Sequence, residues 1–422
     1  MKIESRVIFL DNLRFFFVLC VVLQHAGTAY IGLNWWPVRD DMSLLASCMV
    51  SLFDAFLMPS LFFVAGYFAI PSVRKGGSLL FMRGKLKRLG IPWLVCILTI
   101  GPILPLVYHY TRDGLELTIS YLDRWTAVMG AALQFDIGMM PPMNQLMQND
   151  LFYQRYMWFI GLLILFFACF SGLYRIRRQW FEPSETQLRA TNPSALSTLG
   201  LFLAVGFLTL IGSVVIIGLV MFLLAPGTKN PEAWFTLGNI VQFRVSRIFL
   251  HVTYFSIGVL AFRNRWLERG RFPGHLKTWV VLFLMLAPVL LLLAFMKESG
   301  MGLSEEIMGL LFWVVMNFLT VTSLGLCGAL AKKYWNCTTP LNRQLSANSY
   351  NLYLAHYPFV IGLQLLLYNL PAIPPPLKFA IVSLVAAIAA YAVSHFLIKP
   401  HPKTTIIVMT TLFLGMAVFI RP

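Results

Sequence analysis

The sequence predicts an all-α fold, a polytopic bundle of membrane-spanning helices, and two observations carry this prediction. First, the 422 residues are 58% hydrophobic and only 12% charged, which leaves too little polar surface to cover a soluble protein. Second, a spanning helix needs roughly 20 apolar residues, and eleven segments satisfy or approach that length. These segments are about 8–31, 46–70, 88–108, 156–174, 196–225, 246–262, 278–296, 307–330, 350–370, 377–398 and 404–420.

The charged residues set the direction of the chain through the bilayer. The net charge is +16, but the charges stand in short clusters between apolar runs. Such clusters fix topology and contact the lipid bilayer, so no nucleic-acid partner is expected. With the N-terminus in the cytoplasm, the inside segments carry 22 Lys and Arg residues and the outside segments carry ten. This bias predicts a cytoplasmic N-terminus. The longest outside segment, 109–155, is interpreted either as a lid or docking surface for an external substrate or as an irregular connector.

Two ionisable residues interrupt the first apolar segment, LRFFFVLCVVLQHAG (13–27). Arg14 and His25 are eleven residues apart, which is roughly 16 Å and close to three helical turns. Both therefore face nearly the same way, with the cation near the inner end and the imidazole near the outer end. An ionisable residue in a spanning helix is a functional hypothesis by default. The alternatives are that Arg14 reaches the inner headgroups or pairs with Asp11, and that His25 is a hydrogen-bonded core histidine.

Asp54 lies at a depth similar to that of His25, because the second segment runs back inward from its outer end. A carboxylate can orient an imidazole and stabilise its protonated form, as in hydrolytic triads. We therefore interpret Asp54 as a catalytic residue that supports His25. The alternative is that Asp54 pairs with another helix.

The stretch RGKLKRLGIPWL (83–94) is strongly basic at the inner end of the third segment. Lys85 and Arg88 are three residues apart and share a helix face. With Arg14 they would form a basic pocket at the cytoplasmic surface that suits phosphates, since Arg offers a planar fork and Lys a point charge. Ordinary positive-inside loop charge is the alternative.

Two further groups of polar residues stand in apolar segments. SANSYNLYLAHYPFV (346–360) places Tyr350, Tyr353 and His356 within two turns, and we assign these three to substrate binding. The sixth segment carries Arg247 and His251 near its outer end. For both groups, interhelical packing with a hydrogen bond is the alternative.

Several of these stretches resemble segments of the acyltransferase 3 family of membrane-bound acyltransferases. Arg14 and His25 are similar to that family's R-x10-H motif, and KLKRLGIPWL is similar to its R-x-x-R element, with Lys85 in place of the first Arg. Further similar segments, in the family's order, are LDNLRFFFVLCVVLQHAG (10–27), MPSLFFVAGYFAI (58–70), YMWFIGLLILFF (156–167) and SYNLYLAHYPFV (349–360). The resemblance covers about residues 8 to 400 and looks closest to the subgroup of glucan biosynthesis protein C.

The resemblance implies a ten-helix acyltransferase domain over 1–400, followed here by an additional C-terminal helix in 401–422. It implies transfer of an acyl group, of acetyl or succinyl type, from cytoplasmic acyl-CoA to a hydroxyl of a carbohydrate acceptor, which is often extracytoplasmic. By the same resemblance, His25 would be the catalytic histidine, Arg14, Lys85 and Arg88 would bind the donor, and the protein would lie in a bacterial inner membrane.

The residues alone leave a second class of function open. Intramembrane Arg, Asp and His with Pro-interrupted helices also fit a proton-coupled transporter, and a flippase for a lipid-linked sugar is a third reading. Repeated halves with matching broken helices, which a transporter often has, are not visible. No metal is expected, because the six cysteines form no CxxC pair and no Cys/His ligand spacing.

Overall fold

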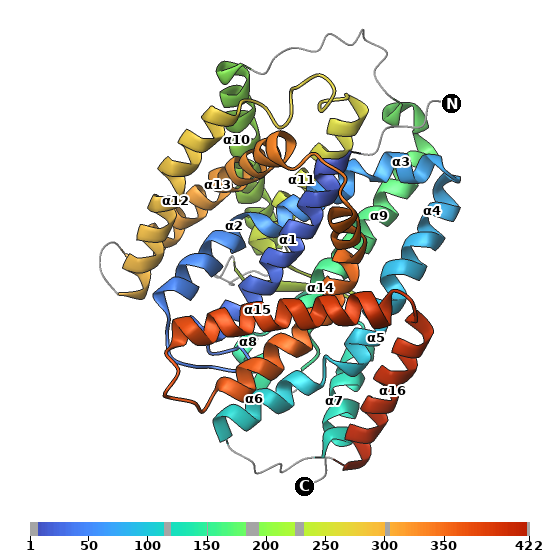
Figure 1. The fold of residues 1–422 in the computed structure, drawn as a ribbon, viewed down its shortest axis with the longest axis vertical. Coiled ribbons are helices and arrows are strands. Elements are labelled where there is room, and N and C mark those ends of the chain that lie inside the picture. Colours follow the sequence, from blue (N-terminus) through green and yellow to red (C-terminus); the bar gives the residue numbers. More distant parts are fainter. Residues whose placement is uncertain are drawn as a thin grey trace.

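The computed structural model describes residues 7–113, 120–149, 151–182, 194–223, 232–299 and 304–419. Within these ranges the chain is a helical bundle, as Figure 1 shows, with one small antiparallel sheet. The sheet was not expected from the sequence. It joins β1 (Ile137–Met139), β2 (Trp234–Leu237) and β3 (Val241–Arg244) in that order.

The predicted multi-helical membrane fold is confirmed, and the described residues of the eleven apolar segments lie mostly on single helices or on series of consecutive helices, as 88–108 does. In the described part of the chain, nine helices or helix series are long and apolar enough to span a bilayer. The long helices are α1 (Ile8–Gly27), α2 (Leu44–Tyr67), α9 (Trp158–Ile176), α10 (Ala195–Leu223), α11 (Val245–Arg263), α12 (Leu276–Glu298), α13 (Glu305–Tyr334), α14 (Pro340–Leu367) and α15 (Pro375–Val393). The shorter ones are α3 (Ala69–Arg74), α4 (Gly77–Lys85), α5 (Ile91–Thr99), α6 (Ile103–Asp113), α7 (Tyr121–Leu133), α8 (Met143–Gln148) and the C-terminal α16 (Pro402–Phe419).

Local sequence explains where the site-bearing helices begin. Ser43 precedes α2, and its hydroxyl accepts a hydrogen bond from the amide of Ala46. Thr339 does the same for Asn342 at the start of α14, with Pro340 in the first turn. These are the side chains that best satisfy the unpaired amides of a first helical turn. α14 therefore begins ten residues before the apolar segment at 350–370 and is one continuous helix.

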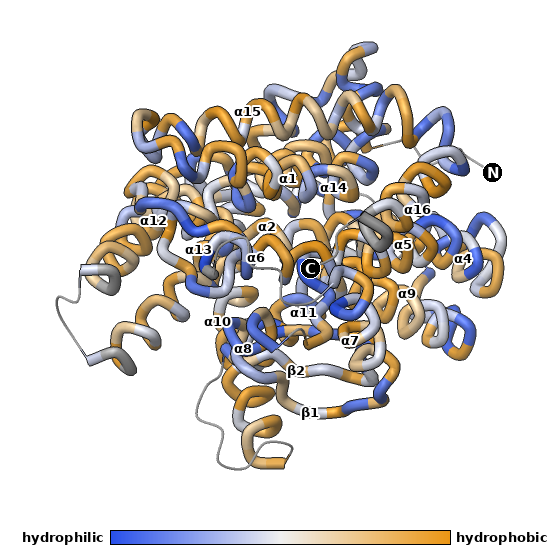
Figure 2. Tube along the Cα trace, turned by 90° about the horizontal axis from the view of Figure 1, so that it is seen from below, coloured by the Kyte–Doolittle hydropathy of each residue, from blue (hydrophilic) through white to orange (hydrophobic). Residues whose placement is uncertain are grey.

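The centre of the bundle is α1, which packs against α2 on one side and α14 on another. Most of its side chains are buried, including Phe17, Val21 and Val22. Figure 2 shows hydrophobic residues along most of the helices, including those at the periphery. Only 22% of the most apolar stretch of α10, α12 or α15 is buried within the chain, so the lipid must cover the rest.

Two glycines bring α2 and α11 into backbone contact. A Cβ atom on Gly66 would overlap the carbonyl oxygen of Phe255, and one on Gly258 would overlap that of Phe63. Small residues allow such close approach between membrane helices. Their contact fixes α11 against α2, and so sets Arg247 beside Asp54.

Candidate functional site

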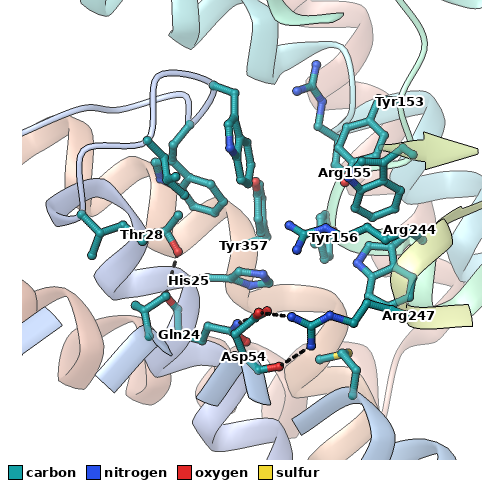
Figure 3. A pocket seen from close by; sticks show the side chains of 18 of the residues that line it. Gln24, His25, Thr28, Asp54, Tyr153, Arg155, Tyr156, Arg244, Arg247 and Tyr357 are labelled. Atoms are coloured by element: carbon teal, nitrogen blue, oxygen red, sulfur yellow. Dashed lines mark hydrogen bonds and ion pairs between the residues drawn. The ribbon is translucent and has the colours of Figure 1, made fainter. Parts of the chain in front are cut away.

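A pocket of about 280 Å³ lies between the C-terminal part of α1, the middle of α2 and the segments that carry the sheet. His25, Asp54 and the loop after α1 form one wall, while the segment after α8, the hairpin β2–β3 and the start of α11 form the other (Figure 3). Aromatic side chains cover much of the surface. Those in the lining are Trp35, Trp36, Tyr153, Tyr156, Trp158, Trp234, Phe312, Tyr353 and Tyr357.

The His25 imidazole is held by a chain of two hydrogen bonds. Its Nδ1 lies 2.8 Å from Nε2 of His356, and Nδ1 of His356 lies 2.6 Å from the carbonyl oxygen of Tyr353. A carbonyl can only accept, so Nδ1 of His356 carries a proton and, in the neutral ring, its Nε2 accepts. His25 therefore donates from Nδ1. The lone pair of its neutral ring is left on Nε2, as a proton acceptor requires.

The residues around His25 fix the ring in place. Trp36 stacks on it at 5.8 Å between centroids, and Tyr357 meets it edge-on at 5.3 Å. Gln364 accepts a hydrogen bond from Trp36 Nε1 and donates to the backbone carbonyl of His25. The histidine is thus positioned by three elements: α1, the loop after it and α14.

The structure does not place Asp54 as expected. In the described part of the chain its carboxylate contacts Arg247, at 2.9 Å from Nη2, and the amide of Gln24 at 3.5 Å. The Nδ1 atom of His25 meets His356 instead. Asp54 still lines the pocket, but its partner is the arginine of a neighbouring helix, which is the alternative that the sequence left open.

His356 also differs from its expected place. We expected it to contact substrate, but it is fully buried behind His25 and does not line the pocket. Tyr353 does line the pocket, and its hydroxyl donates to the carbonyl oxygen of Tyr156. The contact of His25 with His356 joins α1 and α14 through residues that are 331 positions apart in the sequence.

Sequence reasoning missed Arg244 as a site residue, having counted it only as outside charge. It ends β3, directly opposite Trp234 of β2, and its guanidinium lies 5.7 Å from that indole ring. Figure 3 shows Arg244 and Arg247 extending from one wall toward His25 and Asp54 on the other. Burial lowers the pKa of Arg244, but the carboxylates of Asp54 and Glu232 outweigh it, so the pKa is raised and the guanidinium stays charged.

The segment before α9 completes this wall. The side-chain amide of Gln154 donates to the backbone carbonyl oxygens of Asn239 and Ile240, and its backbone N–H donates to Oε1 of Gln242. These hydrogen bonds tie the segment to the β2–β3 hairpin. Arg155 follows with φ of 56°, is buried, and contacts the sulfur of Met147. A non-glycine residue rarely adopts such a φ, so the surrounding contacts must hold it.

The three residues of the expected basic pocket do come together, away from the cavity. Arg14 donates to the Ser349 hydroxyl at 3.1 Å and to the Ser346 carbonyl at 3.0 Å, and lies 3.8 Å from Asp11. Lys85 interacts electrostatically with both Arg14 and Arg88. The Arg88 residue lies on a π-helical turn, Leu86–Gly90, and π-turns are frequent at functional sites.

Tyrosines on one side of α14 connect this basic cluster with the pocket. The Arg88 guanidinium lies 6.0 Å from the ring of Tyr350, whose hydroxyl is buried without a hydrogen-bond partner in the described chain. Tyr353 follows one turn later and Tyr357, against His25, one turn after that. Seven residues of helix span roughly 10 Å, so this row bridges part of the distance between cluster and imidazole.

Comparison with known proteins identifies the chain at the level of its family. No curated protein and no solved structure matches it. The acyltransferase domain that defines the acyltransferase 3 family matches residues 7–395, which include every site residue above and leave α16 outside. The family works on an acyl donor, and the described residues form no group of three or more His, Cys, Asp or Glu side chains that could hold a metal. The chain is thus a multi-pass membrane protein and a transferase enzyme, and it belongs to the acyltransferase 3 family.

Proposed function

We propose that this protein moves an acyl group, of acetyl or succinyl type, from cytoplasmic acyl-CoA to a hydroxyl of a carbohydrate acceptor on the outer side of the membrane. The observation that carries the proposal is the hydrogen-bond chain from His25 through His356 to the Tyr353 carbonyl. This hydrogen-bond chain leaves Nε2 of His25 unprotonated, on a residue that lines the pocket of an acyltransferase.

His25 is the general base in this mechanism. Its Nε2 takes the proton of the acceptor hydroxyl while the hydroxyl oxygen attacks the thioester carbonyl. The carbon–sulfur bond then breaks, and the CoA thiolate takes the proton back from the imidazolium. An ester and free CoA result, and the histidine returns to its starting state. Base catalysis of this kind contributes typically 10²–10⁴-fold.

The donor is assigned to the basic cluster of Arg14, Lys85 and Arg88. CoA carries several phosphates, and clustered guanidinium and ammonium groups are its natural partners. From the cluster, the acyl-bearing arm would follow Tyr350 and Tyr353 along α14 to His25. We take this end of the bundle as cytoplasmic because the positive charges favour it and because CoA is found there.

The acceptor is assigned to the aromatic pocket. The loop after α1, the segment after α8 and the sheet all surround it, and all three belong to outside segments of the predicted topology. Flat aromatic faces with a few polar groups suit a sugar ring. The expected likeness of the chain to the subgroup of glucan biosynthesis protein C makes a glucan the first acceptor to test. Within this scheme Asp54 acts through Arg247, and residues 1–400 form the catalytic unit.

The test is release of free CoA by the protein purified in detergent, with acetyl-CoA or succinyl-CoA as donor and glucan oligosaccharides as acceptors. Wild type is compared with His25→Ala, with Arg14→Ala and, as a control, with His401→Ala, an exposed histidine outside the matched domain. We expect release that disappears in His25→Ala and persists in His401→Ala. Release that continues without His25 would refute the mechanism. If neither thioester bound the wild type, the proton-coupled transporter would become the better explanation of the intramembrane charges.

A further inference from the structure

Arg244 has hydrogen-bonding capacity that the protein does not use. Its Nη1 lies 3.4 Å from Oε2 of Glu232. In the described part of the chain, Nε and Nη2 have no hydrogen-bond partner, and neither atom is enclosed by protein. A guanidinium presents its donors as a planar fork that matches a carboxylate. The three N–H groups on Nε and Nη2 thus make no hydrogen bond with the described residues, although the Asp54 carboxylate is close enough to stabilise the positive charge.

The neighbouring arginine is in a different state. Arg247 donates to the carboxylate of Asp54 at 2.9 Å and to the Asp54 carbonyl at 3.3 Å, and its side chain is only 12% exposed. The guanidinium of Arg247 is therefore already bound to acceptors of the protein. Arg244, at 32% exposure, lines the pocket and extends toward His25 from the opposite wall (Figure 3).

Glu232 is a weak competitor for Arg244. Its side chain is 48% exposed, its contact with Arg244 is a single one at 3.4 Å, and exposed pairs of this kind contribute little. A ligand carboxylate in the less exposed pocket could use two donors at once, and such charge-assisted bidentate bonds are about twice as strong as neutral ones. The Trp234 ring packs near the guanidinium, 5.7 Å from its carbon, because the sheet register sets the two residues opposite each other.

We propose that Arg244 is a specificity residue that binds a carboxylate on the ligand of this pocket. That carboxylate belongs either to the acyl group, as in a half-ester of a dicarboxylic acid, or to an acidic sugar of the acceptor. Naming these two sources rests on the proposed function, whereas the anion site itself does not. The site distinguishes charged from neutral ligands because a neutral one leaves the free donors of Arg244 unsatisfied.

Binding to the full-length protein tests the site without turnover. Trp36, Trp158 and Trp234 line the pocket, so their fluorescence reports occupancy. Two matched pairs of probes differ by one carboxylate: methyl glucuronide against methyl glucoside, and monomethyl succinate against dimethyl succinate. We expect the wild type to bind the charged member of one pair at least tenfold more tightly. The pair that shows the preference identifies the source of the carboxylate.

Four variants test whether that preference belongs to Arg244. Arg244→Gln should abolish it and Arg244→Lys should keep part of it, while Arg39→Gln, at an exposed arginine outside this pocket, should keep it all. Glu232→Gln should bind the charged probe at least as tightly as the wild type, since the exposed carboxylate that it removes competes only weakly for Arg244. Equal affinity for both members of both pairs, a preference that survives in Arg244→Gln, or weaker binding of the charged probe in Glu232→Gln would overturn the proposal.

Turnover separates this proposal from the proposed function. CoA release that requires His25 but shows no preference for charged donors or acceptors would refute the carboxylate site and leave the acyltransferase mechanism intact. An Arg244-dependent binding preference without any CoA release would refute the mechanism and leave the anion site in place.

Discussion

His25 and His356 face each other across the α1–α14 contact with their rings in parallel planes, 1° apart, and 2.8 Å between Nδ1 and Nε2. One ring lines the pocket and the other is fully buried. The buried ring therefore determines which nitrogen of the first carries a proton.

Replacement of His356 should lower the rate of chemistry without weakening donor binding. In His356→Phe, Nδ1 of His25 loses its acceptor and the ring can adopt the wrong tautomer, so we expect kcat to fall about 10²-fold. His356→Gln offers a carbonyl oxygen in its place and should recover part of the loss. The measurement is kcat and KM for acyl-CoA in all three proteins. A change in KM alone, or no rescue by Gln, would contradict the positioning role.

The Asp54–Arg247 pair should behave as one unit. Asp54→Asn removes the charge that Arg247 pairs with, and Arg247→Met leaves the carboxylate without its guanidinium. We expect each single variant to lose activity and thermal stability, and the double variant to lose little more than either one. Coupling between directly bonded side chains is on the order of 0.5–3 kcal/mol. Additive losses in the double-mutant cycle, or full activity in Asp54→Asn, would contradict this prediction.

Arg88 should bind the phosphates of the acyl-CoA donor. We expect the wild type to use acetyl-CoA far better than S-acetyl-pantetheine, which has the same thioester but no phosphate. Arg88→Ala should raise KM for acetyl-CoA about tenfold and leave the truncated donor unaffected, because one charge-assisted contact amounts to about 1.5–3 kcal/mol. Arg83→Ala, in the same basic stretch, is the control. Equal effects on both donors would show that Arg88 has a structural role instead.

Gly258 should be required for the contact of α2 with α11. An alanine there would overlap the backbone of Phe63 and force the helices apart, at a cost of about 1–3 kcal/mol. Gly218→Ala on α10 meets no neighbour and should be neutral or slightly stabilising, since Ala is the better helix former. Thermal unfolding in detergent compares the two. A Gly258→Ala protein as stable as wild type would mean that the helices can separate freely.

The sequence was most informative where a single helix sets the geometry. The length and apolarity of segments such as 196–225 were enough to predict spans, and the 3.6-residue period was enough to place Arg14 and His25 on one face. The start of α14 was placed too late, because its first turns are polar and only the Thr339–Pro340 cap indicates them. The prediction of the spans and the placement of Arg14 and His25 on one face needed no knowledge of tertiary contacts.

The partners of the site residues could not be predicted in the same way. His25 and His356 are 331 positions apart, and depth along a helix does not say which neighbour a side chain meets. Depth alone made Asp54 a plausible support for His25, but α11 supplies Arg247 at the same level. Arg244 was missed because strands of three or four residues give no usable alternation of apolar and polar side chains.

Because one wall of the pocket is carried by the small sheet and the other by helices, the two walls can change independently of each other. Trp234 and Arg244 belong to one hairpin, fastened from the side by Gln154, whereas His25 stands on the helical scaffold opposite. Selection could therefore change which ligands the enzyme accepts by altering the residues of the hairpin, with no disturbance of the base. A chimera that exchanges residues 232–244 with those of another family member should inherit that member's ligand preference in the pocket while keeping its own affinity for the phosphates of CoA.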